Sequence, residues 1–187
     1  MVNECPLRTK GESMESIHYR KILVTHDGSD LASLALPHAV ALAHHYGAEI
    51  LLLHVITSIE QETAMMSSLD GDRYPFVGIQ DSAQEAVKEN KREAKHQLEK
   101  IKTELEKNDV KVTLFVEEGA ASSVIVDVAR KEHCDLIVMA THGRSGLGRV
   151  LLGSVADHII HHSPCPVMVI PPEERKQQQK GKRSWYE

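Results

Sequence analysis

Two patterns of hydrophobic and polar positions alternate along the chain. Short, nearly continuous apolar runs are typical of strands that are buried on both faces of a sheet. Between them, apolar residues recur every three or four positions, which is the period of a helix with one buried face. The runs predict strands at residues 21–26, 49–56, 110–116, 135–140 and 166–170, and the periodic segments predict helices at 31–46, 81–107, 121–131 and from 154 onward.

Strands that alternate with helices predict one α/β domain, with a parallel sheet and helices on both of its faces. In such folds ligands bind at the carboxyl ends of the strands, where the strand order changes direction. We therefore expect the loops after the first and fourth strands to be neighbours. These loops contain Asp27 and a glycine-rich segment that ends at Gly153.

The glycine-rich segment predicts a phosphate site. Glycine adopts positive φ without a Cβ clash, so successive backbone N–H groups can point into one concavity. Gly143 and Gly153 bracket nine residues, and Ser154 then opens a helix whose first N–H groups attract anions. Arg144 and Arg149 lie between the two glycines, where either could screen phosphate charge. The chain is expected to bind a nucleotide or another phosphorylated small molecule.

Asp27 and Ser154 each have more than one interpretation. A carboxylate at position 27 can accept hydrogen bonds from ribose hydroxyls, or it can cap the helix that follows. Ser154 is expected to cap its own helix, with Asp157 completing a capping box, and its hydroxyl can also contact a phosphate. The residues alone leave both interpretations of Asp27 open.

Length, charge and cysteine count narrow the function classes. The 187 residues suit one domain, which we place at 20–172, between a disordered N-terminal extension at 1–19 and a flexible basic tail at 173–187. A net charge of −5 disfavours nucleic acid as a partner. No apolar stretch is long enough to span a membrane. Three cysteines without a C-x-x-C pair favour a reducing cytoplasm.

Signatures of several other functions are missing from the sequence. There is no P-loop, no dinucleotide-binding fingerprint after the first strand, and no nucleophile elbow. His158 and His162 are four residues apart and share a helix face, but no third fixed ligand is visible. We therefore expect a polar helix face there and no metal site.

The chain resembles the universal stress protein family over residues 20–171. The resemblance is carried by residues 21–43 and by residues 139–170. The ATP-binding branch of that family has a glycine, two residues, a second glycine, nine residues, and then Gly-Ser or Gly-Thr. Gly143, residues 144–152 and Gly153-Ser154 match this pattern, and Ala140 stands in place of the first glycine.

The resemblance implies a nucleotide site and a Rossmann-like fold with five parallel strands in the order 3-2-1-4-5. Asp27 would hold the ribose, Val55 would pack on adenine, and Thr25 and His26 would line the base pocket. The residues implied around the phosphates and at the end of the fourth strand are Met139, Ala140, Gly143, Arg144, Gly153, Ser154 and Val155.

The same resemblance implies a cytoplasmic stress-response protein with ATP or AMP as its ligand, which Mg²⁺ can accompany. We expect a nucleotide-dependent sensor or adaptor and not an enzyme, with at most slow ATP hydrolysis and no catalytic residue. Two alternatives stay open. One is a family member without nucleotide binding, and the other is an enzyme of the adenine-nucleotide α-hydrolase type.

The last predicted strand indicates how the chain assembles. Val167, Met168, Val169 and Ile170 are apolar, and in the implied order they lie at a sheet edge, which is prone to aggregation unless it is covered. The same strand of a second copy is the simplest cover. We therefore expect a homodimer through residues 167–170, with Pro171 and Pro172 ending the strand. The sequence does not identify a downstream protein partner.

Overall fold

The computed structural model describes residues 17–56, 80–141 and 153–172. Most of the predicted N-terminal extension, the predicted tail after residue 172 and the centre of the glycine-rich segment lie outside them.

The described elements alternate between strands and helices, as the sequence predicts. Their order is β1 (Lys21–Thr25), α1 (Asp30–Ser33), α2 (Leu36–Tyr46), β2 (Glu49–Ile56), α4 (Gln80–Glu106), β3 (Val112–Glu118), α5 (Ala121–Lys131), β4 (Leu136–Ala140), α6 (Ser154–His162) and β5 (Val167–Ile170). The strands form one five-stranded sheet in the order β3-β2-β1-β4-β5, and every pair is parallel. The predicted α/β fold and strand order are confirmed.

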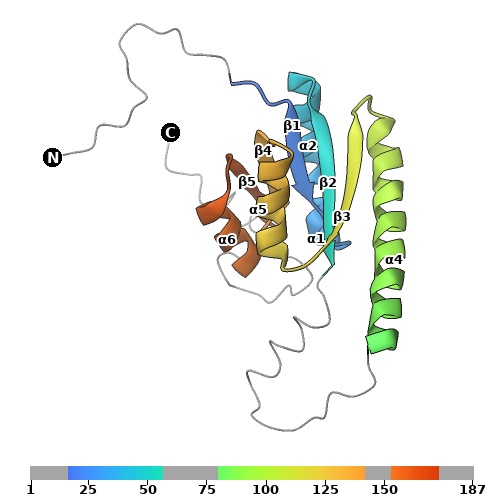
Figure 1. Cartoon of the computed structure of the whole chain (residues 1–187). Coiled ribbons are helices and arrows are strands. Elements are labelled where there is room, and N and C mark those ends of the chain that lie inside the picture. Colours follow the sequence, from blue (N-terminus) through green and yellow to red (C-terminus); the bar gives the residue numbers. More distant parts are fainter. Residues whose placement is uncertain (1–16, 57–79, 142–152, 173–187) are drawn as a thin grey trace, which may run out of the picture.

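Helices cover both faces of the sheet (Figure 1). α5 and α6 pack on one face, over a core that includes Leu23 and Ile137, and α2 and α4 pack on the other, over Val24 and Val138. Successive side chains of a strand point to opposite faces, so each central strand contributes to both cores. All four of these side chains are 0% exposed, which explains why the central strands are continuously apolar in the sequence.

The segment expected to form one helix at 31–46 forms two. α1 ends at Ser33 and α2 begins at Leu36, with two short-range bonds between them, Leu34 N–H to the Leu31 carbonyl and Ala35 N–H to the Ala32 carbonyl. Pro37 stands in the first turn of α2. Proline has no N–H and its ring clashes with the preceding turn, so it is tolerated at a helix start and not in a helix interior. The apolar period continues across this break, which is why the period alone missed it.

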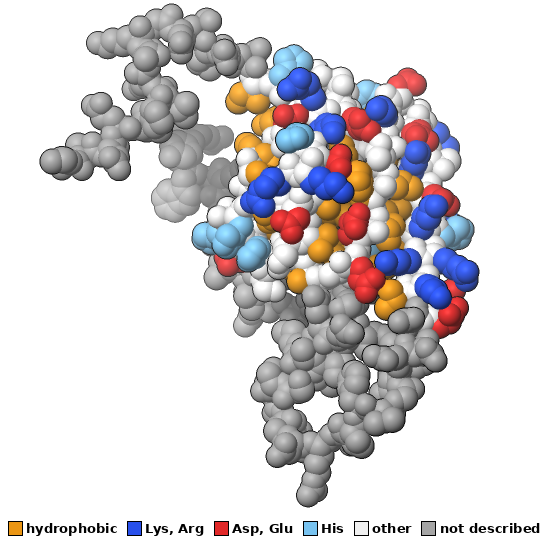
Figure 2. Space-filling view, viewed as in Figure 1, with side chains coloured by type: hydrophobic (Ala, Val, Ile, Leu, Met, Phe, Trp, Pro, Cys, Tyr) orange, Lys and Arg blue, Asp and Glu red, His pale blue; other side chains and the backbone are white. Residues whose placement is uncertain are grey.

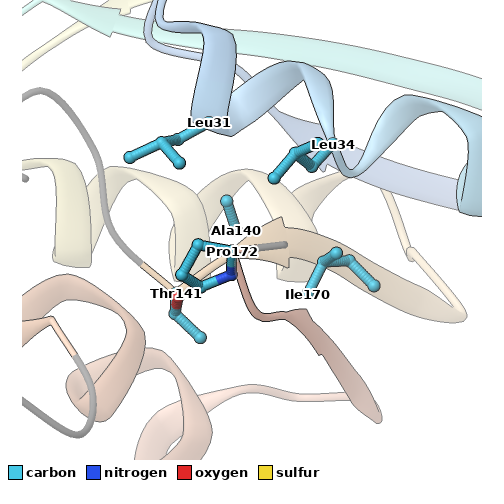
Figure 3. Close-up of a pocket in the computed structure, with 6 residues that line it drawn as sticks. All are labelled: Leu31, Leu34, Ala140, Thr141, Ile170 and Pro172. Carbon is cyan, nitrogen blue, oxygen red and sulfur yellow. The ribbon is translucent and has the colours of Figure 1, made fainter. Parts of the chain in front are cut away.

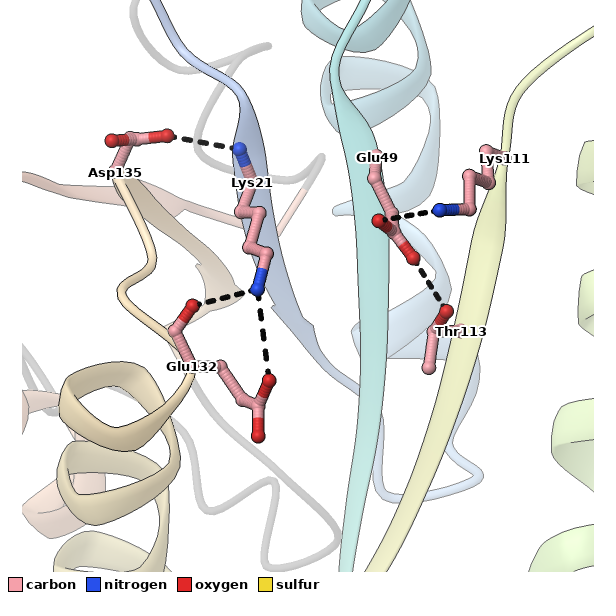
Figure 4. A network of polar contacts seen from close by, with 6 residues as sticks. All are labelled: Lys21, Glu49, Lys111, Thr113, Glu132 and Asp135. Carbon is pink, nitrogen blue, oxygen red and sulfur yellow. Dashed lines mark hydrogen bonds and ion pairs between the residues drawn. The ribbon is translucent and has the colours of Figure 1, made fainter.

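A polar network ties the amino-terminal edge of the sheet together (Figure 4). One carboxylate oxygen of Asp135, just before β4, accepts hydrogen bonds from the backbone N–H groups of Arg20 at 2.7 Å and Lys21 at 2.9 Å. The Lys21 ammonium group donates to the Glu132 carbonyl oxygen at 2.9 Å. On the next strand pair, Glu49 accepts from Lys111 at 3.0 Å. The first of these contacts fixes the start of β1 against the start of β4.

Asp135→Ala is expected to lower the free energy of unfolding by about 1–3 kcal/mol, because two backbone N–H groups lose a charged acceptor. Asp127→Ala is the matched control. Asp127 is exposed on α5, where its carboxylate pairs with the exposed Arg130 at 3.4 Å, so its loss should cost less than about 0.5 kcal/mol. Urea unfolding of both variants measures the difference, and equal stabilities would contradict the assigned role of Asp135.

Candidate functional site

The carboxyl ends of β1 and β4 lie side by side in the middle of the sheet. The two strands pair directly, with Val24 opposite Val138. β4 leads to Thr141, whose N–H donates to the Ile170 carbonyl and whose carbonyl accepts from Gly153 N–H, both at 3.0 Å. The start of α6 is therefore attached to the end of β4. The two loops that the sequence singled out arise from adjacent strands, as expected for a switch point in strand order.

Asp27 forms a tight turn after β1. One oxygen of its carboxylate accepts from the backbone N–H of Ser29 at 3.0 Å and from the Ser29 hydroxyl at 2.6 Å. Gly28 between them has φ +85°, a left-handed conformation that glycine adopts without strain. The cap of α1 is Ser29, whose hydroxyl oxygen accepts from Ala32 N–H at 3.1 Å. Asp27 is therefore not a helix cap, and the turn holds its carboxylate at the carboxyl edge of the sheet.

His26 makes contacts that the sequence did not reveal. Its side chain is 5% exposed, its Nδ1 accepts from Gly28 N–H at 3.0 Å, and its Nε2 lies 3.0 Å from the Ser33 hydroxyl oxygen. That hydroxyl is within 3.3 Å of the Ser29 carbonyl, to which it donates. The sequence resemblance implies that His26 lines a base pocket. In the structure its ring is bonded to the Asp27 turn on one side and to α1 on the other.

These contacts define the protonation state of His26. An Nδ1 that accepts a backbone N–H carries a lone pair, so the ring is neutral with its proton on Nε2. Burial lowers the pKa of the His26 imidazole, the Asp27 carboxylate opposes that shift, and His54 adds to it. The ring is therefore neutral at physiological pH.

The start of α6 differs from the predicted capping box. The cap residue is Gly153, which makes no side-chain cap bond, so Ser154 is the first helical residue and not the cap. The prediction that Ser154 caps the helix was wrong. Gly153 has extended backbone at φ −68° and ψ 152°, and its carbonyl accepts from Asp157 N–H at 2.9 Å. The exposed Ser154 hydroxyl and the first-turn N–H groups therefore remain at the helix start, where an anion is favoured.

Four of the predicted binding residues lie on the α5 and α6 side of the sheet. Val55, Met139 and Val155 belong to, or pack against, the core beneath these helices. Alternation along β1 puts Thr25 on the same side. Met139 is 4% exposed, so its side chain serves the core, whereas Val55 and Val155 are half-buried. The structure thus brings these residues to the same side of the sheet as α6.

Ala140 lies toward the opposite face, where it lines a small pocket (Figure 3). Leu31 and Leu34 of the first helical segment, Thr141, Ile170 and Pro172 complete the lining. The cavity volume is about 10 Å³, which is close to the space for one water molecule and far below that of a nucleotide site. Ala140 is therefore a packing residue on this side. Gly143 and Arg144 lie outside the described residues.

Histidines gather on α6, and Figure 2 shows them as a pale blue group. The rings of His158 and His162 stack with centroids 4.1 Å apart, and His161 lies beside them. The Nδ1 atoms of His161 and His162 lie 2.8 Å from the carbonyl oxygens of Asp157 and His158, one turn earlier in the same helix. Within the described ranges, no group of three or more His, Cys, Asp or Glu side chains could hold a metal ion.

Among the residues that the structure describes, no helix is both long enough and apolar enough to cross a membrane. On the face shown in Figure 2, acidic and basic side chains are interspersed over α4 and α5.

Residues 18–171 match the model of a family described as the universal stress protein family. Two relatives come from Methanocaldococcus jannaschii. Universal stress protein MJ0531 is 36% identical over 81% of this chain and 82% of its own length. Universal stress protein MJ0577 is 37% identical over 83% of this chain and 96% of its own length. The solved structure of MJ0577 superposes with a TM-score of 0.71 and covers 83% of this chain and 98% of its own chain.

Two more distant structures of the same fold contain a nucleotide. One is a universal stress protein family protein from Arabidopsis thaliana with AMP bound, which is 21% identical with a TM-score of 0.56 over 84% of this chain and 94% of its own. The other is a universal stress protein in complex with cAMP, which is 19% identical with a TM-score of 0.52 over 83% of this chain and 98% of its own.

The assigned helix caps give a direct test of the local structure. Ser29→Ala is expected to lower the free energy of unfolding by about 0.5–2 kcal/mol, because the Ala32 N–H and the Asp27 carboxylate each lose a partner. Ser154→Ala, the same substitution at the first position of α6, should change it by less than about 0.5 kcal/mol. Thermal unfolding of the two variants distinguishes them. A larger loss for Ser154→Ala would show that Ser154 caps α6 after all.

Proposed function

Because the chain belongs to the universal stress protein family, we propose that it binds an adenine nucleotide, ATP or AMP, and acts in stress response as a nucleotide-dependent sensor or adaptor. The observation that carries this proposal is the placement of the Asp27 turn and the start of α6 at the carboxyl ends of two adjacent strands. The Asp27 turn supplies a carboxylate for sugar hydroxyls, and the start of α6 supplies N–H groups for phosphate.

Each group in the candidate site has a chemistry that suits one part of an adenine nucleotide. The Asp27 carboxylate is oriented by Ser29, and a charged acceptor of this kind suits the two hydroxyls of a ribose. The N–H groups of Ser154 and Val155 start a helix, so they favour the phosphate groups. Val55, half-buried at the end of β2, offers an apolar contact for adenine. The AMP-bound and cAMP-bound relatives support an adenine nucleotide as the ligand class.

We assign the nucleotide the role of a ligand and not of a rapidly turned-over substrate. We assign no catalytic role to the predicted binding residues. When ATP is the ligand, Mg²⁺ would accompany it and neutralise charge on its phosphates. At most slow hydrolysis is expected. The odd number of cysteines favours a reducing compartment, and we place this function in the cytoplasm.

Calorimetric titration with ATP and with AMP, each with and without Mg²⁺, tests the proposal. We expect micromolar dissociation constants for the wild type. Asp27→Ala should weaken binding by about 1.5–3 kcal/mol, the value of a hydrogen bond to a charged group, while the protein stays folded. Asp127→Ala, on the exposed face of α5, should bind as the wild type does.

Two outcomes would contradict the proposal. Wild-type protein that binds neither nucleotide would indicate a family member without nucleotide binding. Rapid release of product would favour an enzyme of the adenine-nucleotide α-hydrolase type. Melting temperatures of both aspartate variants separate a loss of affinity from a loss of fold.

We further propose that the chain forms a homodimer through β5. This strand lies at the sheet edge, and Val167, Met168 and Val169 are half-buried. Ile137 N–H and Thr141 N–H bond to the carbonyls of Pro166 and Ile170. In a parallel ladder, residues alternate between bonding inward and pointing outward. The backbone groups of Val167 and Val169 therefore face away from β4, where β5 of a second copy can pair with them.

Val169→Pro tests this interface. It removes an outward N–H and leaves the ladder to β4 intact, and proline is tolerated on an edge strand in that orientation. We expect the wild type to sediment as a dimer and this variant as a folded monomer. Analytical ultracentrifugation at micromolar concentration, with the melting temperature as the check on folding, measures both. A wild-type monomer, or a variant that stays dimeric, would overturn the β5 interface.

A further inference from the structure

We infer that His26 is a positioning residue that holds the Asp27 turn in its binding geometry only while its imidazole is neutral, so that acidification loosens the turn and weakens nucleotide binding. The effect on nucleotide binding rests on the proposed function. The effect on the Asp27 turn concerns the ligand-free protein and rests on contacts of the described residues.

The contacts that hold the Asp27 turn, which we call the clamp, run through the buried ring of His26. Gly28 N–H donates to His26 Nδ1 at 3.0 Å, and Gly28 is the residue whose left-handed φ of +85° allows the turn. On the other side, His26 Nε2–H donates to the Ser33 hydroxyl oxygen at 3.0 Å. Ser33 in turn donates to the Ser29 carbonyl at 3.3 Å. The ring thus links the centre of the turn to the first helical segment.

The same ring is anchored to the sheet through its backbone. His26 N–H donates to the Leu53 carbonyl of β2 at 2.9 Å, and the side chain is 5% exposed. Here the imidazole joins the turn to α1, and the backbone of the same residue is fixed to the sheet, so the position of the Asp27 carboxylate depends on the ring.

Protonation breaks this arrangement for a definite reason. A second proton enters at Nδ1, the atom that accepts from Gly28, and two N–H groups then face each other. The groups that face the ring are Asp27 from its own turn, His54 from β2 and Ser33 from α1. Asp27 favours the charged ring, whereas His54 and burial oppose it. The cation forms only below the ordinary histidine pKa of 6.5, because burial lowers the pKa of His26.

The lowered pKa of His26 determines how the stability of the folded chain changes with pH. Between the lowered pKa of folded His26 and its ordinary value of 6.5, the unfolded chain binds more protons than the folded chain, so the contribution of His26 to stability decreases as pH falls through this window. Nucleotide affinity should decrease at lower pH, through the folded pKa itself, because the bound geometry needs the neutral ring.

Two substitutions separate the clamp from a general packing role. His26→Asn keeps an acceptor at the position of Nδ1 and does not titrate, and His26→Leu removes both ring nitrogens. Relative to the wild type at neutral pH, we expect His26→Asn to bind AMP within about twofold and His26→Leu to bind it on the order of two- to tenfold more weakly, as for the loss of one hydrogen bond. His44→Asn, at an exposed position of α2, is the matched control.

The decisive readout is the pH profile. On acidification, the wild type and His44→Asn should lose affinity for AMP by on the order of two- to tenfold relative to His26→Asn. The titration of the AMP phosphate cancels in this ratio, since all proteins meet the same ligand. A constant ratio between the wild type and His26→Asn from about pH 5 to pH 8 would overturn the inference.

NMR of the ligand-free protein tests the clamp without the proposed function. Imidazole nitrogen spectra should show the proton on Nε2 at neutral pH, and the Gly28 amide resonance should shift together with the His26 titration. A proton on Nδ1, or a Gly28 amide that ignores that titration, would overturn the clamp. If NMR shows the clamp while the wild type binds no nucleotide, the proposed function fails, and the regulatory half of the inference fails with it.

Discussion

The pairing of β1 with β4 is the contact on which the rest of the structure depends. Ile22, Leu23, Val24, Ile137 and Val138 are all 0% exposed, so these strands occupy the middle of both cores. Asp135 fixes their amino-terminal ends. Parallel pairing then places both carboxyl ends at one edge of the sheet. From that edge the chain continues to opposite faces of the sheet, into α1 after β1 and toward α6 after β4.

The two sides of the candidate site are stabilised in different ways. The Asp27 turn is held by side chains, since Ser29 and His26 both bond to it. The start of α6 is held by a backbone bond from Gly153 N–H to the Thr141 carbonyl. A turn held by side chains can respond to their protonation. Backbone N–H groups do not titrate, so among the described residues acid acts on the sugar side of the proposed site, through His26.

Apolar patterning predicted the fold well because the central strands are buried on both faces, as Leu51 and Leu52 show at 2% and 0% exposure. It failed where a local backbone effect interrupts a continuous pattern, at Pro37 between α1 and α2. Capping was predicted wrongly at Ser154, because a glycine one residue earlier takes the cap position. The contacts of His26 join residues 26, 28 and 33, and neither strand nor helix periodicity describes a bond within a turn.

The central claim is that the two carboxyl ends form one nucleotide site, and amide NMR of the isotope-labelled protein titrated with AMP tests it most directly. The account predicts that Gly28, Ser29, Gly153, Ser154 and Val155 shift together with a single dissociation constant, while Asp127 and the other exposed amides of α5 stay in place. Shifts on only one of the two sides, or shifts confined to another surface, would contradict it.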